Sequence, residues 1–228
     1  MQTNARLRQT LFIRKQNTLI CKEDTVKTIA SWSLVVAVLF ISAVEARQTI
    51  NGCEIKRRAS CPGANLSGAN LTKSNLASAD LAGADLSGAD LSGDRITEAN
   101  LIKANLTNAN LSGANLSLAY MSGANFSRAN LAKSDLSQST MPGASFREAN
   151  LAGANLSLAN LKGVDLTGAN ATGAVFTLAS MVDANLTRAD LTKAIMTGAD
   201  LRNAILQDAR FCNTTMPDRS INNSGCPR

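Results

Sequence analysis

Residues 99–118 read ANLIK ANLTN ANLSG ANLSL, four five-residue units in which alanine, asparagine and leucine recur in the same order. The unit continues without a register break from Ala64 to about Asp218. Stepping by five from Leu66 to Met216 gives 31 central positions, of which 20 are Leu, five Met and four Phe. Two residues before the centre, 25 of the 31 units have Ala, and one residue before it 21 have Asn or Asp. The period of five therefore governs most of the chain.

Neither a straight α-helix nor a flat β-strand can bury leucines that recur every five residues. On an α-helix a step of five residues turns by roughly 500°, so the leucines would spiral around every side. On a flat strand the odd spacing would send successive leucines to opposite faces. A chain that changes direction every five residues can turn both Ala and Leu inward, because residues two apart in an extended segment point the same way. Asn or Asp then faces outward, and the Ser/Thr-Gly pair forms the corner.

The tandem Ala-Asn-Leu-Ser-Gly unit resembles the pentapeptide-repeat family, whose members form a right-handed, four-sided parallel β-helix with four pentapeptides per coil. The resemblance covers about 155 of 228 residues. It implies an all-β solenoid of about eight coils, roughly 37 Å long, with a capped end on each side. The expected domains are a leader at 1–46, an N-terminal cap at 47–63, the β-helix at 64–211 and a C-terminal cap at 212–228. Residues 20 apart would stack, so Phe126 would lie on Phe146.

Composition argues against catalysis. Histidine is absent, which removes the commonest metal ligand and the usual general base near neutral pH. The aspartates and lysines are scattered over outward positions, so we expect no enzyme activity, no cofactor and no metal site. The first 46 residues contribute +3 from six basic and three acidic side chains, which leaves +3 of the net +6 for the rest. That excess is too small to predict nucleic-acid binding.

The first 46 residues are typical of a secretory leader. Residues 28–44 carry no charge, a basic stretch precedes them, and Val44-Glu45-Ala46 has small residues at both positions that a signal peptidase reads. We expect cleavage after Ala46 and an exported product that is not held in a membrane. An uncleaved signal anchor is the alternative, although the apolar run is short for a span of about 20 residues. Translation from Val26 would give a leader of ordinary length and the same mature protein.

Beyond the leader the chain keeps four cysteines: Cys53, Cys61, Cys212 and Cys226. An even number behind a secretory leader indicates disulfides. In the rod that the resemblance implies, Cys61 and Cys212 lie roughly 36 Å apart, whereas a disulfide requires Cα atoms within about 7 Å. We therefore expect Cys53–Cys61 in one cap and Cys212–Cys226 in the other. Two cysteine pairs also suggest zinc, but opposite ends of a rod cannot share one ion.

Segments 61–66 and 211–226 resemble exported pentapeptide-repeat proteins of cyanobacteria and chloroplasts, which implies the thylakoid lumen or the periplasm. We expect a non-catalytic structural or protein-binding scaffold there. The alternative is the DNA mimicry by which some family members inhibit DNA gyrase and protect it from quinolones. Mimicry needs an acidic rod, and here acidic and basic residues share one side. They are Asp85, Glu148 and Asp165 with Arg128, Arg147 and Arg188.

One side of the predicted rod carries outward apolar residues. Steps of 20 place Leu118, Leu158 and Leu178 in one column with Gln138 between them, and Val175 and Ile195 stack on the same side. A contiguous apolar patch on a polar surface can mark a contact face. Either a second copy of the chain or an unknown protein would occupy it. The alternative is that these side chains lie at corners covered by their neighbours, or reflect sequence drift.

Asp94 is the one charged residue at an inward Ala position, with Ser74 as its neighbour one coil away. We expect a local distortion satisfied by hydrogen bonds rather than a functional acid, because no partner chemistry accompanies it.

Overall fold

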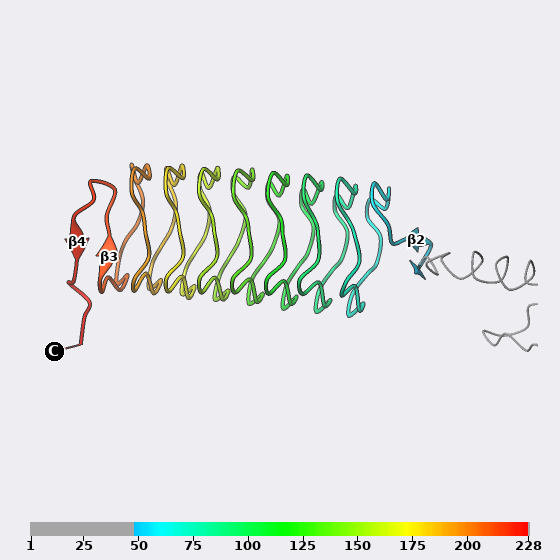
Figure 1. Cartoon of the computed structure of the whole chain (residues 1–228), viewed down its shortest axis with the longest axis horizontal. Helices are drawn as coiled ribbons and strands as arrows, with labels where there is room; N and C mark the ends of the chain where they lie inside the picture. Colours follow the sequence, from blue (N-terminus) through cyan, green and yellow to red (C-terminus); the bar gives the residue numbers. More distant parts are fainter. Residues whose placement is uncertain (1–47, 228) are drawn as a thin grey trace, which may run out of the picture. The chain divides into compact units, whose positions relative to one another are not determined.

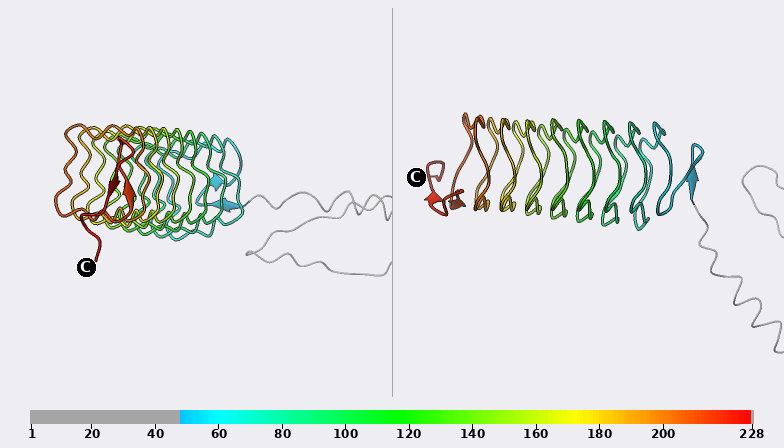
Figure 2. Two further views of the ribbon diagram at one scale, coloured as in Figure 1. Left: turned by 60° about the vertical axis from the view of Figure 1, so that its left-hand side comes forward. Right: turned by 90° about the horizontal axis from the view of Figure 1, so that it is seen from above.

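The computed structural model describes residues 48–227, and the predicted leader lies outside them. Their backbone winds into stacked coils (Figure 1). Parallel bridges join residues 20 apart, from Ser60 with Asp80 to Ile195 with Thr215. Each coil bonds to the next through pairs such as the Leu86 N–H with the Asn105 carbonyl, 2.7 Å, and the Asn105 N–H with the Ala84 carbonyl, 2.9 Å. The coils nest as closed outlines in the oblique view of Figure 2.

The core consists of the alanine and leucine positions. Within the coils the central side chains from Leu66 to Met196 are almost fully buried, as are most of the alanines two residues before them. Phe126 and Phe146 stack with their ring centroids 4.7 Å apart, as expected. The coil that contains Phe176 also has Ala171 as a centre, so a small residue accompanies the large one.

Every corner requires a left-handed residue. Gly88 has φ of 65°, and Lys103 has φ of 55° at the corresponding corner position. An L-residue pays a steric penalty in this region that glycine does not. The corners therefore explain why Gly recurs two residues after many of the centres.

Many of the asparagines that precede a centre bond to two neighbours at once. The Asn150 Oδ1 accepts from the backbone N–H of Ala152 at 3.2 Å, which closes the corner. The Asn150 Nδ2 donates to the Asn130 Oδ1 in the adjacent coil at 3.0 Å. Asn130 donates in turn to Asn110 at 3.2 Å, and Asn110 to Asp90 at 3.0 Å. This ladder runs from Asp90 to Asn170 along one face of the rod.

The strands of the described region lie only in the caps. β1 (Thr49–Ile50) pairs antiparallel with β2 (Cys53–Glu54), and β3 (Thr214–Thr215) pairs antiparallel with β4 (Ile221–Asn222). Corresponding sides of successive coils pair in parallel. Each side contributes only one bridged residue, because a corner follows within three residues, and so it forms no longer strand. Coiling also begins at Ser60, inside the segment 47–63 that the sequence predicts as a cap.

Disulfides join Cys53 to Cys61 and Cys212 to Cys226, with Cα–Cα distances of 5.5 and 4.7 Å. Each therefore closes a loop within one cap. The described part of the chain contains no helix that could cross a membrane.

Candidate functional site

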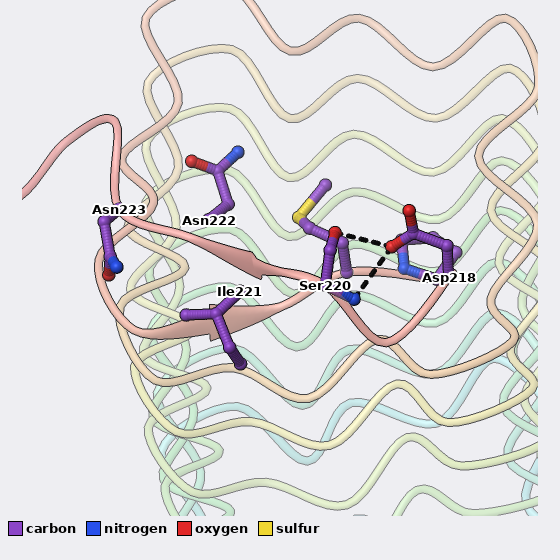
Figure 3. A pocket seen from close by; sticks show the side chains of 7 residues that line it. Asp218, Ser220, Ile221, Asn222 and Asn223 are labelled. Carbon is purple, nitrogen blue, oxygen red and sulfur yellow. Dashed lines mark hydrogen bonds between the residues drawn. The ribbon is translucent and has the colours of Figure 1, made fainter.

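The described residues offer little that could carry chemistry. None of their His, Cys, Asp and Glu side chains gather in threes as a metal site would require. A shallow hollow at the C-terminal cap is lined by seven residues (Figure 3): Met216, Pro217, Asp218, Ser220, Ile221, Asn222 and Asn223. Its carboxylate, Asp218, accepts from the backbone N–H of Ser220 at 2.9 Å and from the Ser220 hydroxyl at 2.6 Å. The one carboxylate among the lining residues is therefore held by its own turn.

One face of the coils carries pairs of opposite charges. The Arg128 Nε lies 2.8 Å from the Glu148 carboxylate, and the Arg147 guanidinium lies 2.9 Å from Asp165. The hydrogen bond from Arg128 lowers the pKa of Glu148 below its ordinary value. We name these four residues the ion-pair face. Its alternating signs differ from the continuous acidic surface that a DNA mimic needs.

Asp94 lies inside the coil, 1% exposed. The Ser74 hydroxyl donates to its Oδ2 at 2.9 Å, whereas Oδ1 has no hydrogen-bond partner among the described residues. Burial raises the pKa of Asp94 to about 6, against the smaller opposing effect of the Ser74 hydrogen bond. The predicted Ser74 contact is present, but it satisfies only half of the carboxylate.

The predicted apolar residues lie together along one side of the rod. Leu118, Leu158 and Leu178 are 44%, 55% and 59% exposed, and Ile195 is 41% exposed. Val175 is bridged to Ile195 in the next coil and is half-buried. We name Leu158, Val175, Leu178 and Ile195 the apolar face; Leu118 lies on the same corner, two coils away from Leu158.

The three leucines occupy strained corners. Their φ angles are 61°, 62° and 58°, in the left-handed region. The other non-glycine residues that the described structure places there are polar or charged. A left-handed L-residue costs roughly 1 kcal/mol, and large exposed side chains recover little of that by burial. Because every corner shares this strain, it is the exposure of the large apolar side chains that distinguishes this corner.

The sequence analysis did not identify three further exposed apolar side chains. Tyr120 and Ile205 are 53% and 51% exposed at positions where Asn or Asp is usual, the signal that identifies Val175 and Ile195. Ile221 in β4 is 56% exposed, and it pairs with Thr215, which is itself bridged to Ile195. Ile221 lies in the cap beyond the last coil, so the coil spacing could not place it beside the apolar face.

The coil geometry agrees with a family match. The sequence pattern named Pentapeptide repeats matches eight copies, at residues 57–93, 99–138, 141–177, 159–198 and 179–216. The chain belongs to the pentapeptide-repeat family. The fold of this family is the right-handed quadrilateral β-helix, which agrees with the coils described above.

Solved pentapeptide-repeat proteins are similar to this one. HetL from the cyanobacterium Nostoc sp. strain PCC 7120, which is involved in regulating heterocyst differentiation, is 27% identical over 81% of this chain and 98% of its own, with a TM-score of 0.46. A protein of the Arabidopsis thaliana thylakoid lumen is 33% identical over 46% of this chain and 66% of its own, with a TM-score of 0.22. The fluoroquinolone resistance protein QnrB1 is 19% identical over 66% and 90%, with a TM-score of 0.31. No curated protein matches.

Proposed function

We propose that this pentapeptide-repeat protein is a non-catalytic, exported scaffold that binds a protein through its apolar face. The observation that carries the proposal is the set of exposed apolar side chains on a rod whose other outward positions are mostly Asn, Asp, Ser and Thr. Protein interfaces use such patches, and isolated exposed leucines would not gather on one corner. The paired charges elsewhere support a protein partner rather than nucleic acid.

Export is supported by the predicted leader, by the two disulfides and by the likeness to a protein of the thylakoid lumen. Disulfides persist in oxidising compartments and are rare where thiols are kept reduced. We place the mature protein in the thylakoid lumen or the periplasm. Mass spectrometry of the exported protein should find Arg47 or Gln48 at its N-terminus; a full-length chain in the membrane fraction would replace this proposal with the signal anchor.

The binding experiment compares the wild-type chain with one that carries Leu158→Ser, Val175→Asn, Leu178→Asn and Ile195→Asn. Both are tagged, returned to their own compartment, crosslinked and captured. The control is Leu118→Ser on the same corner. We expect a protein that the wild type and the control capture and the fourfold variant loses. Equal capture by all three chains, with the fold intact by circular dichroism, would remove the apolar face as the binding site.

Inhibition of gyrase remains the second candidate function, and the likeness to QnrB1 is the reason to test it. Because the ion-pair face alternates in sign, we expect the mature protein to leave gyrase supercoiling unchanged at micromolar concentration. Strong inhibition would reverse the ranking of the two functions.

A further inference from the structure

The last coil ends in an edge that the C-terminal cap covers only in part, and we name residues 199–208 the open edge. Within residues 48–227, hydrogen-bond partners are missing for the N–H groups of Leu201, Asn203, Leu206 and Asp208 and for the carbonyls of Ala199 and Ala204. In the preceding coil the Leu186 N–H donates to the Ile205 carbonyl at 2.8 Å, and the Arg188 N–H donates to the Gln207 carbonyl at 2.9 Å. An unpaired edge of this kind can accept another extended segment.

The sequence of the cap keeps the five-residue spacing of the coils, although its backbone does not follow them. Two further steps of five from Met216 reach Ile221 and Cys226. In a continued coil, Ile221 would lie over Leu201, and Cys226 would lie over Leu206. The central side chains of the earlier coils are buried, whereas Ile221 is 56% exposed. The repeat therefore identifies a segment of this chain that matches the open edge.

The residue types of this segment suit a continued coil. Asn223 would stand at a corner, as Asn203 does with φ of 58°. Pro227 would follow a centre by one position, as Pro217 does, and the Pro217 carbonyl accepts from the Gly198 N–H at 2.9 Å. Neither the corner nor the missing proline N–H would prevent the segment from pairing with the open edge.

Arg219 is the residue at which the chain leaves the coil. Its φ of 70° is left-handed three positions after the Met216 centre, whereas the corners of the coils are left-handed two positions after a centre. The Arg219 N–H still donates to the Met216 carbonyl at 2.9 Å, as the Ala204 N–H does to the Leu201 carbonyl at 3.0 Å. In a continued coil the Arg219 side chain would belong to the last layer, from which a long stem lets the guanidinium reach water.

The C-terminal disulfide holds this segment away from the open edge. Cys212 belongs to the side of the coil that follows the open edge, so Cys226 cannot lie over Leu206 and stay bonded to Cys212. Both cysteines of this pair are half-buried, whereas Cys53 and Cys61 are 3% and 7% exposed. Because thiol–disulfide exchange depends on access to the sulfur atoms, a reductant should open the C-terminal pair first.

We propose that reduction of the Cys212–Cys226 disulfide releases residues 219–227 to continue the β-helix over the open edge. A dithiol supplies two electrons and two protons, the S–S bond becomes two thiols, and the dithiol becomes its own disulfide. The four free N–H groups of the open edge then donate to the carbonyls of Ser220, Asn222, Gly225 and Pro227. In exchange, β4 leaves β3, and the bond from the Gly225 N–H to the Phe211 carbonyl is lost. The cap is thus a strap with two positions, and its redox state selects between them.

Hydrogen exchange of the exported protein, followed amide by amide, tests the proposal. Dithiothreitol is added until peptide mapping shows that only the C-terminal disulfide has opened. The amides of Leu201 and Leu206 should then exchange at least about tenfold more slowly, while that of Gly225 changes its partner. Reoxidation should restore the original rates.

A variant separates the release of the strap from other effects of the reductant. Cys212→Ser leaves the N-terminal disulfide intact and should protect Leu201 and Leu206 without dithiothreitol. The matched control removes the other pair, through Cys53→Ser with Cys61→Ser, and should leave both amides as fast as in the oxidised wild type. Should Cys212→Ser not fold, the reduced wild type still gives the answer.

Ile221→Asp tests which segment covers the open edge. Ile221 is exposed in the oxidised protein, so the substitution should leave its exchange rates unchanged. In the reduced protein it should abolish the new protection, because a carboxylate would then lie over Leu201. Asn222→Asp adds the same charge at an outward position and should keep the protection.

Unchanged or faster exchange at Leu201 and Leu206 after reduction, with the circular dichroism of the coils intact, would overturn the proposal. An equal loss of protection in the Asn222→Asp and Ile221→Asp chains would do the same. Protection of the oxidised chain that rises with protein concentration would assign the open edge to a second copy instead. None of these outcomes involves the apolar face, so the proposed scaffold function is tested separately.

Discussion

The two ends of the rod close in different ways. At the N-terminal end, the side chains of Asn51 and Gln48 donate to the carbonyls of Asn65 and Asn70 at 2.8 and 3.2 Å, and the backbone N–H of Cys61 donates to the Asp80 carbonyl at 2.8 Å. These contacts reach several sides of the first coil. The disulfide then fixes the segment that supplies them.

The C-terminal cap covers only part of its coil. The Gly225 N–H donates to the Phe211 carbonyl at 2.7 Å, and the Met216 N–H donates to the Ser220 carbonyl at 2.8 Å. The backbone N–H groups of Leu201 and Leu206 have no partner within residues 48–227, and both side chains are partly exposed. The same leucine position is almost fully buried in the preceding coils, so coverage by the next layer, and not residue type, decides burial at an end.

The largest effect should come from the aromatic residue under the C-terminal cap. Phe211 is 7% exposed, and Phe211→Ala should lower the free energy of unfolding by about 3–5 kcal/mol. Ile55 is equally buried in the N-terminal cap, and Ile55→Ala should cost about 2–4 kcal/mol. Denaturant unfolding followed by circular dichroism measures both. A negligible cost at Phe211 would show that this cap does not seal the core.

Removing each disulfide should cost about 3 kcal/mol at the C-terminal end and slightly less at the N-terminal end, because the N-terminal loop is shorter. The variants are Cys212→Ser with Cys226→Ser, and Cys53→Ser with Cys61→Ser. Non-reducing peptide mapping of the wild type should show only these two local pairs. A crosslink between the two ends would contradict the stacked-coil geometry.

The inward column that contains Asp94 and Thr214 makes the two ends of the rod differ in how their stability depends on pH. Near the C-terminal end, Thr214 in this column donates its hydroxyl to the Leu191 carbonyl at 2.7 Å, so it is satisfied. Near the N-terminal end, the column holds Asp94, whose pKa is raised to about 6. The folded chain therefore binds this proton more tightly than the unfolded chain does. Stability from this group is greatest at low pH and falls by up to about 3 kcal/mol as the pH rises through 6.

Asp94→Ala should remove this slope and stabilise the protein above pH 6, since Ala occupies the same inward position in other coils. The measurement is the difference between variant and wild type at pH 4.5 and pH 8. Asp90 acts in the opposite sense: the backbone N–H of Ser92 lowers its pKa, so its contribution is lost only below about pH 4. A variant less stable than wild type at pH 8 would contradict the assignment.

The smallest effect concerns the capping side chains. Asn51→Ala and Gln48→Ala each remove one hydrogen bond to a carbonyl of the first coil and should cost about 1 kcal/mol. Hydrogen exchange should show the open C-terminal edge without mutation, with the amides of Leu201 and Leu206 exchanging much faster than that of Leu186, which is bonded to the Ile205 carbonyl at 2.8 Å. Equal protection would mean that the C-terminal edge is closed as well.

The sequence predicts the interior better than the ends because the interior repeats one set of contacts. The inward Ala and Leu, the corners, the Phe126–Phe146 stack and the column of corner leucines all follow from the five-residue register and a coil of 20. The exposure of Leu201 and Leu206 does not, since their units look like those in the middle of the rod. Asn51-Gly52, with φ angles of 46° and 82°, is a hairpin signal from which β1 and β2 could have been predicted.

The candidate site likewise has residues that the repeat pattern reveals and one that only the structure explains. Val175, Ile195 and the three leucines are recognisable because each departs from the residue type usual at its position in the unit. Gly198 is invisible to that test, since glycine is the usual corner residue; only the structure shows that the Leu178 side chain lies across it.

The 20-residue register also constrains how such a gene can grow. Duplicating 20 residues lengthens the rod by one coil and leaves every later face pointing as before. Duplicating a single pentapeptide keeps the inward and outward alternation but turns all later residues by a quarter of a revolution. Such an event between Leu158 and Val175 would carry Val175, Leu178 and Ile195 to a different side while the core remained intact. Length variants of this protein that retain the apolar face should therefore differ by whole coils.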